Sequence, residues 1–320
     1  MFGKGDRHPD LRGDMTPAGT PLQNAERILA AKGQTFHWAK RLLSRLHGER
    51  AARLYAFCRY LDDLVDEGAS ADAARELLEV AAEAIRRGQT SAPGLADALG
   101  LMRECMIEPP VPLELIAGLQ QDLGAVRIAT ETELLRYCYR VAGTVGLMMS
   151  NILDAKDPAA APFAIDLGIG MQLTNICRDV RDDALRGRCY LPESLIGKVP
   201  LGALASPSAA EQVELRAAIG HLLTLADRYY ASGERGLSFL PLRARHGILI
   251  AARAYRQIGV RLRARRCDAW SGRSVVSGLE KFGLTLRAFA GTGFDRGFWR
   301  HPSVHEMSLH LALQGLPRVH

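Results

Sequence analysis

The sequence predicts an all-α protein that folds as a single domain. Long segments rich in Ala and Leu repeat their apolar residues at helical spacing, and alternating strand patterns are nearly absent. The chain has neither an internal repeat nor the βαβ rhythm of a parallel sheet. Its 48% hydrophobic and 24% charged residues are ordinary globular values, so a chain of 320 residues can bury a large core.

Helical patterns follow one another along the chain, and turn-forming residues separate them. Gly68 and Gly88 mark two of the breaks, and prolines mark most of the others. The longest internal loop candidate begins at Pro192. The expected helices are residues 22–46, 49–67, 71–88, 93–105, 111–122, 129–156, 159–186, 208–235, 241–270 and 275–289. The expected divisions are a flexible arm over 1–21, an all-α domain over 22–290 and a tail of uncertain structure over 291–320.

The bulk chemistry favours a cytoplasmic protein with an anionic ligand. A net charge of +6 suits such partners, although the densest basic run, RLRARRCDAW, favours a solvated helix face over a nucleic-acid patch. The six cysteines show neither a CxxC pair nor zinc spacing, which indicates reduced thiols. We find no apolar run of membrane-span length and no apolar signal segment near the first residue.

The stretch RYLDDLVDE concentrates carboxylates at the end of an apolar helix. At about 100° per residue, Asp62 and Asp66 lie on one face, and Tyr55 and Arg59 continue the same stripe. Carboxylates at a helix C-terminus are disfavoured by the helix dipole, and no lysine neighbours them. A divalent cation would relieve both problems, because Mg²⁺ binds carboxylate oxygens together with substrate phosphates.

Two alternatives stay open for this stretch. Asp63 and Glu67 form a rival pair at the same spacing, and helical geometry alone does not decide which pair faces inward. The aromatic and basic residues of the stripe favour the pair that begins at Asp62. A bare DDxxD also occurs by chance, as a solvated acidic helix end without an ion.

A second row of oxygen ligands lies in MQLTNICRDVRDDALRGRCYLP. Asn175, Asp179 and Asp183 recur every four residues, and Gln172 falls on the same side. Arginines surround this row, at Arg178, Arg181, Arg186 and Arg188. Carboxylates mixed with arginines suit a diphosphate bridged by Mg²⁺, because the metal binds the carboxylates and the arginines bind the remaining phosphate oxygens.

The second row also has a purely structural alternative. Arg178 and Asp182 would form one rung of an intrahelical ladder of salt bridges, and Asp182 is itself within reach of the metal-binding face. Chance explains two such rows in one all-α chain less easily than it explains one. The two rows could face each other across a bundle, as carboxylates do in other metal-binding bundles.

A helix of small residues, YCYRVAGTVGLMMSNI, lies between the two rows. Ala142, Gly143 and Gly146 leave a smooth face, at a cost of about 1 kcal/mol for each glycine relative to alanine. Such a face serves either close helix packing or room for a long apolar chain. Met148 and Met149 follow, and adaptable methionine side chains suit an apolar wall.

Together these motifs resemble the squalene/phytoene synthase family of head-to-head prenyl synthases. DDLVD resembles the first aspartate-rich motif of the family, and QLTNICRDVRDD with RCYLP resembles the second. YCYRVAGTVG resembles the signature helix between them, and the resemblance spans Phe36 to Phe289. It implies an isoprenoid-synthase helical bundle with a central cavity, in which two prenyl diphosphates bind with Mg²⁺.

The resemblance implies a role for each motif position. Magnesium would be held by Asp62, Asp66, Asn175, Asp179 and Asp183. The expected catalytic side chains are Tyr55, Arg59 and Tyr137. Substrate would be bound by Thr35, Phe36, Val141, Ala142, Gly146, Gln172, Arg178, Arg188 and Tyr190. In KGQTFHWA, Gln34 stands where the family usually has lysine, and Lys32 could compensate.

The implied reaction has two steps. Metal-assisted loss of one diphosphate gives an allylic cation, and the double bond of the second substrate attacks it to form a cyclopropyl diphosphate. This intermediate then ionises, rearranges and loses a proton. Magnesium and arginines would stabilise the departing charge, and a dry cavity would protect the cation. The chain shows neither a membrane anchor nor GxGxxG, which favours a synthase that needs no NADPH.

The expected product is phytoene, made from two geranylgeranyl diphosphates, because GLMMS, GRCYLP and AWSGRSVVSGLEK most resemble bacterial phytoene synthases. The alternatives within the family use farnesyl diphosphate and make dehydrosqualene, squalene or presqualene diphosphate. A non-catalytic family member is a further alternative, and the intact aspartates argue against it. The resemblance implies Mg²⁺ as cofactor, with Mn²⁺ as a substitute. The expected partners are prenyl diphosphates, peripheral membrane lipid and a downstream desaturase, not nucleic acid, and the oligomeric state stays open.

Overall fold

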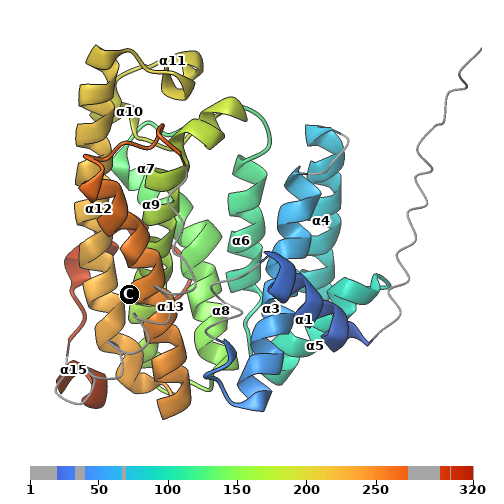
Figure 1. The fold of residues 1–320 in the computed structure, drawn as a ribbon. Helices are drawn as coiled ribbons and strands as arrows, with labels where there is room; N and C mark the ends of the chain where they lie inside the picture. Colours follow the sequence, from blue (N-terminus) through green and yellow to red (C-terminus); the bar gives the residue numbers. More distant parts are fainter. Residues whose placement is uncertain (1–19, 33–39, 67–69, 273–295, 303, 320) are drawn as a thin grey trace, which may run out of the picture.

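The structure, a computed structural model, describes residues 20–32, 40–66, 70–272, 296–302 and 304–319 (Figure 1). Helices form nearly all of the regular structure in these ranges, so the predicted all-α class is confirmed. The longer helices are α1 (Pro21–Lys32), α3 (Arg45–Asp66), α4 (Ala71–Arg87), α5 (Pro93–Glu104), α6 (Pro110–Gln121), α7 (Glu131–Cys138), α8 (Thr144–Ile152), α9 (Ala161–Leu185), α12 (Ala209–Arg235) and α13 (Leu242–Ala264). The shorter ones are η1 (Tyr139–Gly143), η2 (Pro158–Ala160), α10 (Glu193–Ile196), α11 (Leu201–Ala205), η3 (Gly236–Phe239), α15 (Arg296–Trp299) and η4 (Met307–Leu313).

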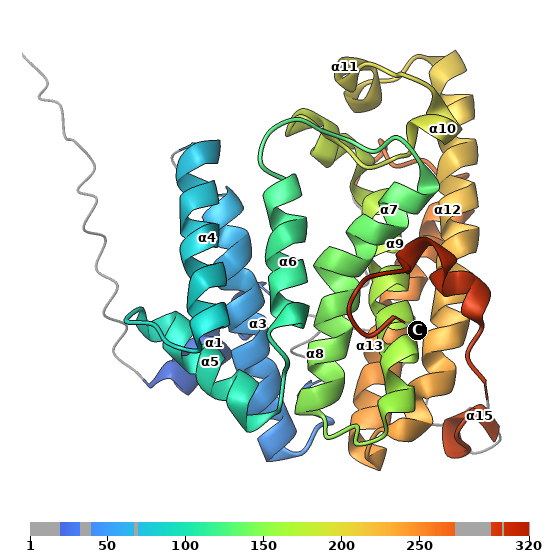
Figure 2. The same cartoon turned by 180° about the vertical axis from the view of Figure 1, so that it is seen from behind.

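Helix α9 runs through the middle of the bundle. Helices α12 and α13 pack against one side of it, and η1 and α8 pack against another (Figure 1). Helices α3, α4 and α6 lie beyond α8, as the opposite view shows (Figure 2). Buried side chains from both halves join in one main hydrophobic core, which fixes α3 and α9 in the same body. The two predicted polar rows therefore project from different helices of one bundle.

Capping residues explain where several helices begin and end. The Ser70 hydroxyl accepts a backbone hydrogen bond at the start of α4, and Gly88 adopts the left-handed conformation that ends it. Ser208 and Glu211 form a reciprocal capping box at the start of α12. These boundaries agree closely with the predicted helices 71–88 and 208–235, because the capping signals are local in the sequence.

The predicted helix 22–46 is wrong over residues 41–44. A turn over residues 41–44 precedes α3, so the break expected near residues 47–48 lies inside a helix instead. Ser44 accounts for the new start, since its Oγ accepts a hydrogen bond from the backbone N–H of His47 at 3.2 Å. The hydrophobic pattern continues across this turn, and periodicity alone therefore hides it.

The predicted helix 129–156 changes its hydrogen bonding in the middle. The segment η1, between α7 and α8, is a π-helical turn. Such a turn inserts one extra residue into an α-helix and is frequent at functional sites. It shifts the face that α8 presents relative to α7, and an ideal helical wheel drawn over the whole stretch misplaces its second half.

Two other regions differ from the prediction. Strands β1 (Val126–Arg127) and β2 (Arg188–Cys189) pair in parallel, with Val126 opposite Arg188. This ladder is too short to produce an alternating pattern in the sequence. The loop expected from Pro192 contains α10 and α11, and the expected helix 275–289 lies outside the described residues.

The C-terminal segment, defined here as residues 304–319, lies across the face seen in Figure 2. The Tyr229 hydroxyl of α12 donates to the carbonyl of Leu309 at 2.7 Å. The guanidinium of Arg136 on α7 donates to the carbonyls of Ala312 and Gln314 at 3.1 and 3.0 Å. These bonds give a definite course to a segment for which the sequence alone predicted no structure.

Two further observations concern the whole described chain. All six cysteines are free thiols, as predicted. Within the described ranges, every helix is too short or too polar to cross a lipid bilayer.

Candidate active site

A cavity of ≈ 360 Å³ lies between α3, α8, α9 and α13. Its wall is mostly apolar and includes Leu54, Val145, Met149, Leu153, Phe163, Leu167, Met171, Leu237 and Ile248. Met149 thus borders the cavity as expected, whereas Met148 is buried in the core instead. A wall of leucines and flexible methionines suits a long hydrocarbon chain.

The small-residue helix packs closely against α9 and also borders the cavity. Val141, Ala142 and Gly146 all border the cavity. A Cβ on Gly146 would lie 2.1 Å from the carbonyl oxygen of Ala164 on α9, and a Cβ on Gly168 would lie 2.3 Å from the carbonyl oxygen of Ala142. Only glycine permits these approaches, because such distances are far inside van der Waals contact. The close packing of η1 and α8 on α9 therefore fixes one wall of the cavity.

On α3, the rival residues Asp62 and Asp63 have different surroundings. Tyr55 and Asp62 border the cavity. Arg59 forms an i,i+4 ion pair with Asp63, and it does not border the cavity. The expected catalytic role of Arg59 stays a prediction. Asp62 is the member of the pair that faces the cavity.

On α9, Gln172 and Asn175 border the same cavity as Asp62. The amide nitrogen of Asn175 donates to Gln172 Oε1 at 3.4 Å, a long hydrogen bond. Asn175 Oδ1 is buried and makes no hydrogen bond. A buried carbonyl oxygen in this condition is costly, and a hard cation would satisfy it. The oxygen chemistry at this end of the cavity therefore fits Mg²⁺.

Toward the C-terminal end of α9, the row continues with two half-buried aspartates, Asp179 and Asp183. Arg178 donates to Asp179 from its Nε at 2.7 Å, so this pair is already joined. Asp183 lies in a small cleft with Arg188 and Tyr190. Burial, and then the charge of Asp179, raises the pKa of Asp183 to about 7 against the opposing effect of nearby arginines. A bound cation would favour the ionised form of this carboxyl.

Tyr137 and Tyr190 meet at a buried carboxylate that the sequence did not single out. Their hydroxyls donate to Asp122 at 2.9 and 2.6 Å, and their rings stack with centroids 4.8 Å apart. Neither tyrosine borders the main cavity, where a catalytic and a substrate-binding role were expected. In this structure they anchor strand β2, and they thereby hold Arg188 near Asp183. The sequence offers no local signal for Asp122, because its partner Tyr190 lies 68 positions away.

Several expected site residues lie where the structure gives no side-chain description. Thr35, Phe36 and Gln34 lie outside the described residues, as does Glu67. Asp66 is the last residue of α3, and only its backbone is described.

The structure shows where Asp182 lies and adds two residues to the cavity wall. The side chain of Asp182 is exposed, unlike those of Asp179 and Asp183. Lys40 borders the cavity and pairs with Glu26 on α1. Tyr255 enters the wall from α13. Lys40 directly follows the stretch KGQTFHWA, so a search for a phosphate-binding lysine could have extended to it.

Comparison with known proteins agrees with this arrangement. A family model described as squalene/phytoene synthase matches residues 29–280. The 15-cis-phytoene synthase of Pantoea ananas is 32% identical over 293 residues, which cover 88% of this chain and 94% of that protein. A phytoene synthase of Thermus thermophilus is 36% identical over 271 residues, covering 84% and 92%.

A solved structure gives the same result in three dimensions. The crystal structure of a dehydrosqualene synthase in complex with ligand superposes with a TM-score of 0.77 at 26% identity, covering 85% of this chain and 96% of that one. The sequence motifs, the bundle and the polar end of its apolar cavity are thus explained together. The chain belongs to the squalene/phytoene synthase family of prenyltransferases.

Proposed function

We propose that the protein condenses two molecules of geranylgeranyl diphosphate head to head into phytoene, with Mg²⁺ as cofactor. One observation carries the proposal: oxygen ligands from α3 and α9, Asp62, Gln172 and Asn175, border one cavity whose wall is otherwise mostly apolar. A prenyl diphosphate has this division, with a charged head and a long hydrocarbon tail. The names of the curated relatives support phytoene as the product.

The residues present fit a magnesium ion. Asp62 supplies a carboxylate from α3, and Asn175 supplies a buried amide oxygen that makes no hydrogen bond. Asp179 and Asp183 continue the row along α9, and Asp66 ends α3. Mg²⁺ prefers oxygen ligands and is commonly shared between one or two carboxylates and substrate phosphates. When bound, the ion would neutralise charge on the leaving diphosphate.

Basic side chains would share the diphosphate with these oxygen ligands. Lys40 borders the cavity, and Arg178 lies beside Asp179 on α9. Arginine suits this task because its planar guanidinium can donate two parallel hydrogen bonds to phosphate oxygens. Both side chains already hold carboxylate partners, Glu26 and Asp179 respectively. We therefore expect them to exchange or share these partners when substrate enters.

The proposed chemistry balances without an oxidant or a reductant. The C–O bond of the first substrate breaks, diphosphate leaves, and the double bond of the second substrate attacks the allylic cation. Loss of a proton closes a cyclopropyl ring. The second diphosphate then leaves, the carbon skeleton rearranges, and loss of another proton gives a hydrocarbon with a conjugated triene at its centre. The apolar wall formed by residues such as Leu153, Phe163 and Leu167 excludes the water that would trap either cation.

The substrate length is tested by incubating the purified chain with Mg²⁺ and either geranylgeranyl or farnesyl diphosphate, without NADPH. Mass analysis of the extract should show a C40 triene from the longer substrate. A C30 hydrocarbon, or presqualene diphosphate, from the shorter substrate alone would retain the reaction class and replace the substrate. The absence of product from both, in the wild type as in Asp62→Ala, would contradict the enzymatic proposal.

The same proposal extends to the surroundings of the enzyme. Its substrates and product partition into lipid, so we propose peripheral membrane contact and a desaturase that consumes the product. Leu242 and Trp299 are 49% and 50% exposed, and Arg243 and Arg300 beside them are exposed as well. Apolar and basic side chains together suit the surface of an anionic bilayer. Flotation with anionic and with neutral vesicles tests this contact.

A further inference from the structure

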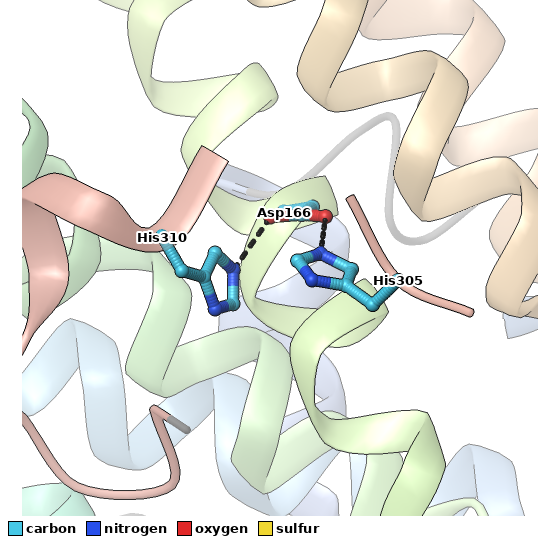
Figure 3. Close-up of side chains that lie close together, drawn as sticks. All are labelled: Asp166, His305 and His310. Carbon is cyan, nitrogen blue, oxygen red and sulfur yellow. Dashed lines mark hydrogen bonds and ion pairs between the residues drawn. The ribbon is translucent and has the colours of Figure 1, made fainter. Parts of the chain in front are cut away.

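A second group of metal-binding residue types lies on the other side of α9, away from the carboxylate row. Asp166 belongs to α9, and His305 and His310 belong to the C-terminal segment (Figure 3). His305 Nε2 lies 2.7 Å from Asp166 Oδ2, and His310 Nε2 lies 2.9 Å from Asp166 Oδ1. The two imidazole rings approach the carboxylate from different sides, with centroids 4.4 Å apart.

The group is buried, and among the described residues the ion-pair partners of Asp166 are the two histidines. The Asp166 side chain is fully buried, and the His305 and His310 side chains are only 7% and 2% exposed. Burial alone would raise the pKa of Asp166, but hydrogen bonds from His305 and then His310 outweigh burial and hold the pKa below its usual range. A buried carboxylate of this kind is normally paired with a cation or bound to a metal.

Hydrogen bonds within the group do not satisfy all of its polar atoms. His305 Nδ1 is buried without a hydrogen-bond partner. Ser232 on α12 contributes to the lowered pKa of Asp166, yet its buried Oγ makes no hydrogen bond of normal geometry. His305 Nδ1 stays without a partner whether Nε2 donates to Asp166 or binds a metal, so it does not distinguish the two arrangements. The Ser232 oxygen does, because a metal ion at this group would supply the partner that the hydrogen bonds leave out.

We propose that Asp166, His305 and His310 bind a Zn²⁺-class transition-metal ion, which fastens the C-terminal segment to helix α9. This site is separate from the magnesium ligands and does not depend on the proposed reaction.

The donor set selects the kind of metal. Two imidazole nitrogens and one carboxylate oxygen suit Zn²⁺ and its neighbours, whereas Mg²⁺ prefers oxygen alone. The three donor atoms lie within 4.8 Å of one another. Tetrahedral zinc with bonds of about 2.0–2.1 Å places neighbouring donors about 3.3 Å apart, so each nitrogen–oxygen pair would separate by roughly 0.5 Å. The ring proton of each neutral histidine would move to Nδ1, which frees Nε2 to bind.

The fourth position of a tetrahedral ion has a candidate on the same face. Ser232 Oγ, or a water held by it, could complete the coordination. The metal would link residues that are 139 and 144 positions apart in the chain. Its effect would therefore be structural, since it would hold the C-terminal segment against the helix that carries Asn175, Asp179 and Asp183.

The test uses the full chain stripped with a chelator, then incubated with Zn²⁺ or Co²⁺ in an excess of Mg²⁺ that occupies the oxygen-only sites. His305→Gln and His310→Gln are the test variants, because glutamine keeps an N–H donor close to the Nε2 position but lacks imidazole. His301→Gln is the matched control, a histidine from the same part of the chain outside the group. Bound metal is measured after desalting, and Co²⁺ additionally reports four-coordinate nitrogen ligation through its visible absorption.

The wild type and His301→Gln should retain about one equivalent of Zn²⁺, gain thermal stability from it, and give a visible Co²⁺ band. His305→Gln and His310→Gln should bind at least about tenfold more weakly while they stay folded in circular dichroism. Folded wild type that retains no Zn²⁺ would overturn the proposal and leave a hydrogen-bonded latch. Equal retention by the two test variants would overturn it as well, because the ion would then lie elsewhere. None of these readouts requires catalysis.

Discussion

The acidic rows of α3 and α9 both lie in the last turns of their helices, but their arginines form different ion pairs. On α3, Arg59 pairs with Asp63 one turn away, and Asp62 faces the cavity. On α9, Arg178 pairs with the adjacent Asp179, a member of the row itself. The two helices thus carry similar residues in different ways, since the arginine of α3 pairs with an aspartate beside the row and the arginine of α9 pairs with an aspartate of the row.

This difference bears on how the two rows would share one ion and one diphosphate. On α3, the Asp62 carboxylate borders the cavity, and Asp66 is the last residue of the helix. The α9 row offers a graded series, from the amide oxygen of Asn175 at the cavity to the enclosed carboxyl of Asp183.

The largest expected effect separates the neighbouring aspartates of α3. Asp62→Asn should lower turnover of geranylgeranyl diphosphate by about 10²–10³-fold, because it removes charge from the metal-binding end of the cavity. Asp63→Asn should lower turnover by less than about tenfold, since it mainly loses an ion pair with Arg59. Initial rates at saturating Mg²⁺ measure both. Equal losses in the two variants would show that the cavity-facing position of Asp62 does not matter.

The next effect tests whether close packing fixes the α9 row. Gly146→Ala places a Cβ 2.1 Å from the carbonyl oxygen of Ala164, which is backbone and cannot move alone. We expect a loss of about 1–3 kcal/mol in the free energy of unfolding. We also expect a higher Mg²⁺ concentration for half-maximal activity, because the α9 row would be displaced. Gly100→Ala on α5 is the control, because its Cβ would meet only the end of the Arg53 side chain at 3.5 Å. That variant should be neutral or more stable by up to about 1 kcal/mol.

These packing contacts also show what could be predicted from sequence and what could not. The helices with local capping signals, such as α4 and α12, were predicted almost to their ends. The π-turn η1 and the parallel ladder between β1 and β2 were not, because both depend on contacts between distant segments. The Gly146 contact with α9 is of the same kind. Composition indicated a smooth face, but only the structure shows which carbonyl meets it.

The candidate site follows the same division. Helical spacing singled out Asp62 and Asn175 as candidate metal ligands, and both residues border the cavity. Helical angles could not choose between Asp62 and Asp63, because the choice depends on how α3 packs against the other helices around the cavity. Asp122 and Asp166 escaped notice for a related reason. Their partners, such as Tyr190 and His310, are far away in the sequence and leave no periodic signal.

A smaller effect tests the cavity end of the α9 row. Asn175→Ala removes a buried amide oxygen that makes no hydrogen bond, and it should raise the Mg²⁺ concentration for half-maximal activity by about 10–100-fold. Asp182→Ala should leave that concentration unchanged, because its side chain is exposed. Mg²⁺ titrations of initial rate distinguish the two. A similar shift in both variants would indicate a general electrostatic effect of α9 rather than ligation by Asn175.

The smallest effect is a pH dependence that only the enclosed end of the α9 row should show. The pKa of Asp183 is raised from 3.8 to about 7, so the folded protein keeps a proton that the unfolded chain releases. Its contribution to stability therefore falls as pH rises from about 4 to about 7, in the absence of metal.

Mg²⁺ competes with that proton, and the affinity of the protein for Mg²⁺ should rise about tenfold between pH 6 and pH 8, in step with the ionised fraction of Asp183. The Mg²⁺-induced increase in melting temperature, measured across this range, should grow with pH in the wild type and in Asp182→Asn. It should be flatter in Asp183→Asn, which has no proton to lose. If the Asp183→Asn variant retained the full pH dependence, the titrating group would be another member of the row, and the enclosed carboxyl would have no special part in holding the ion.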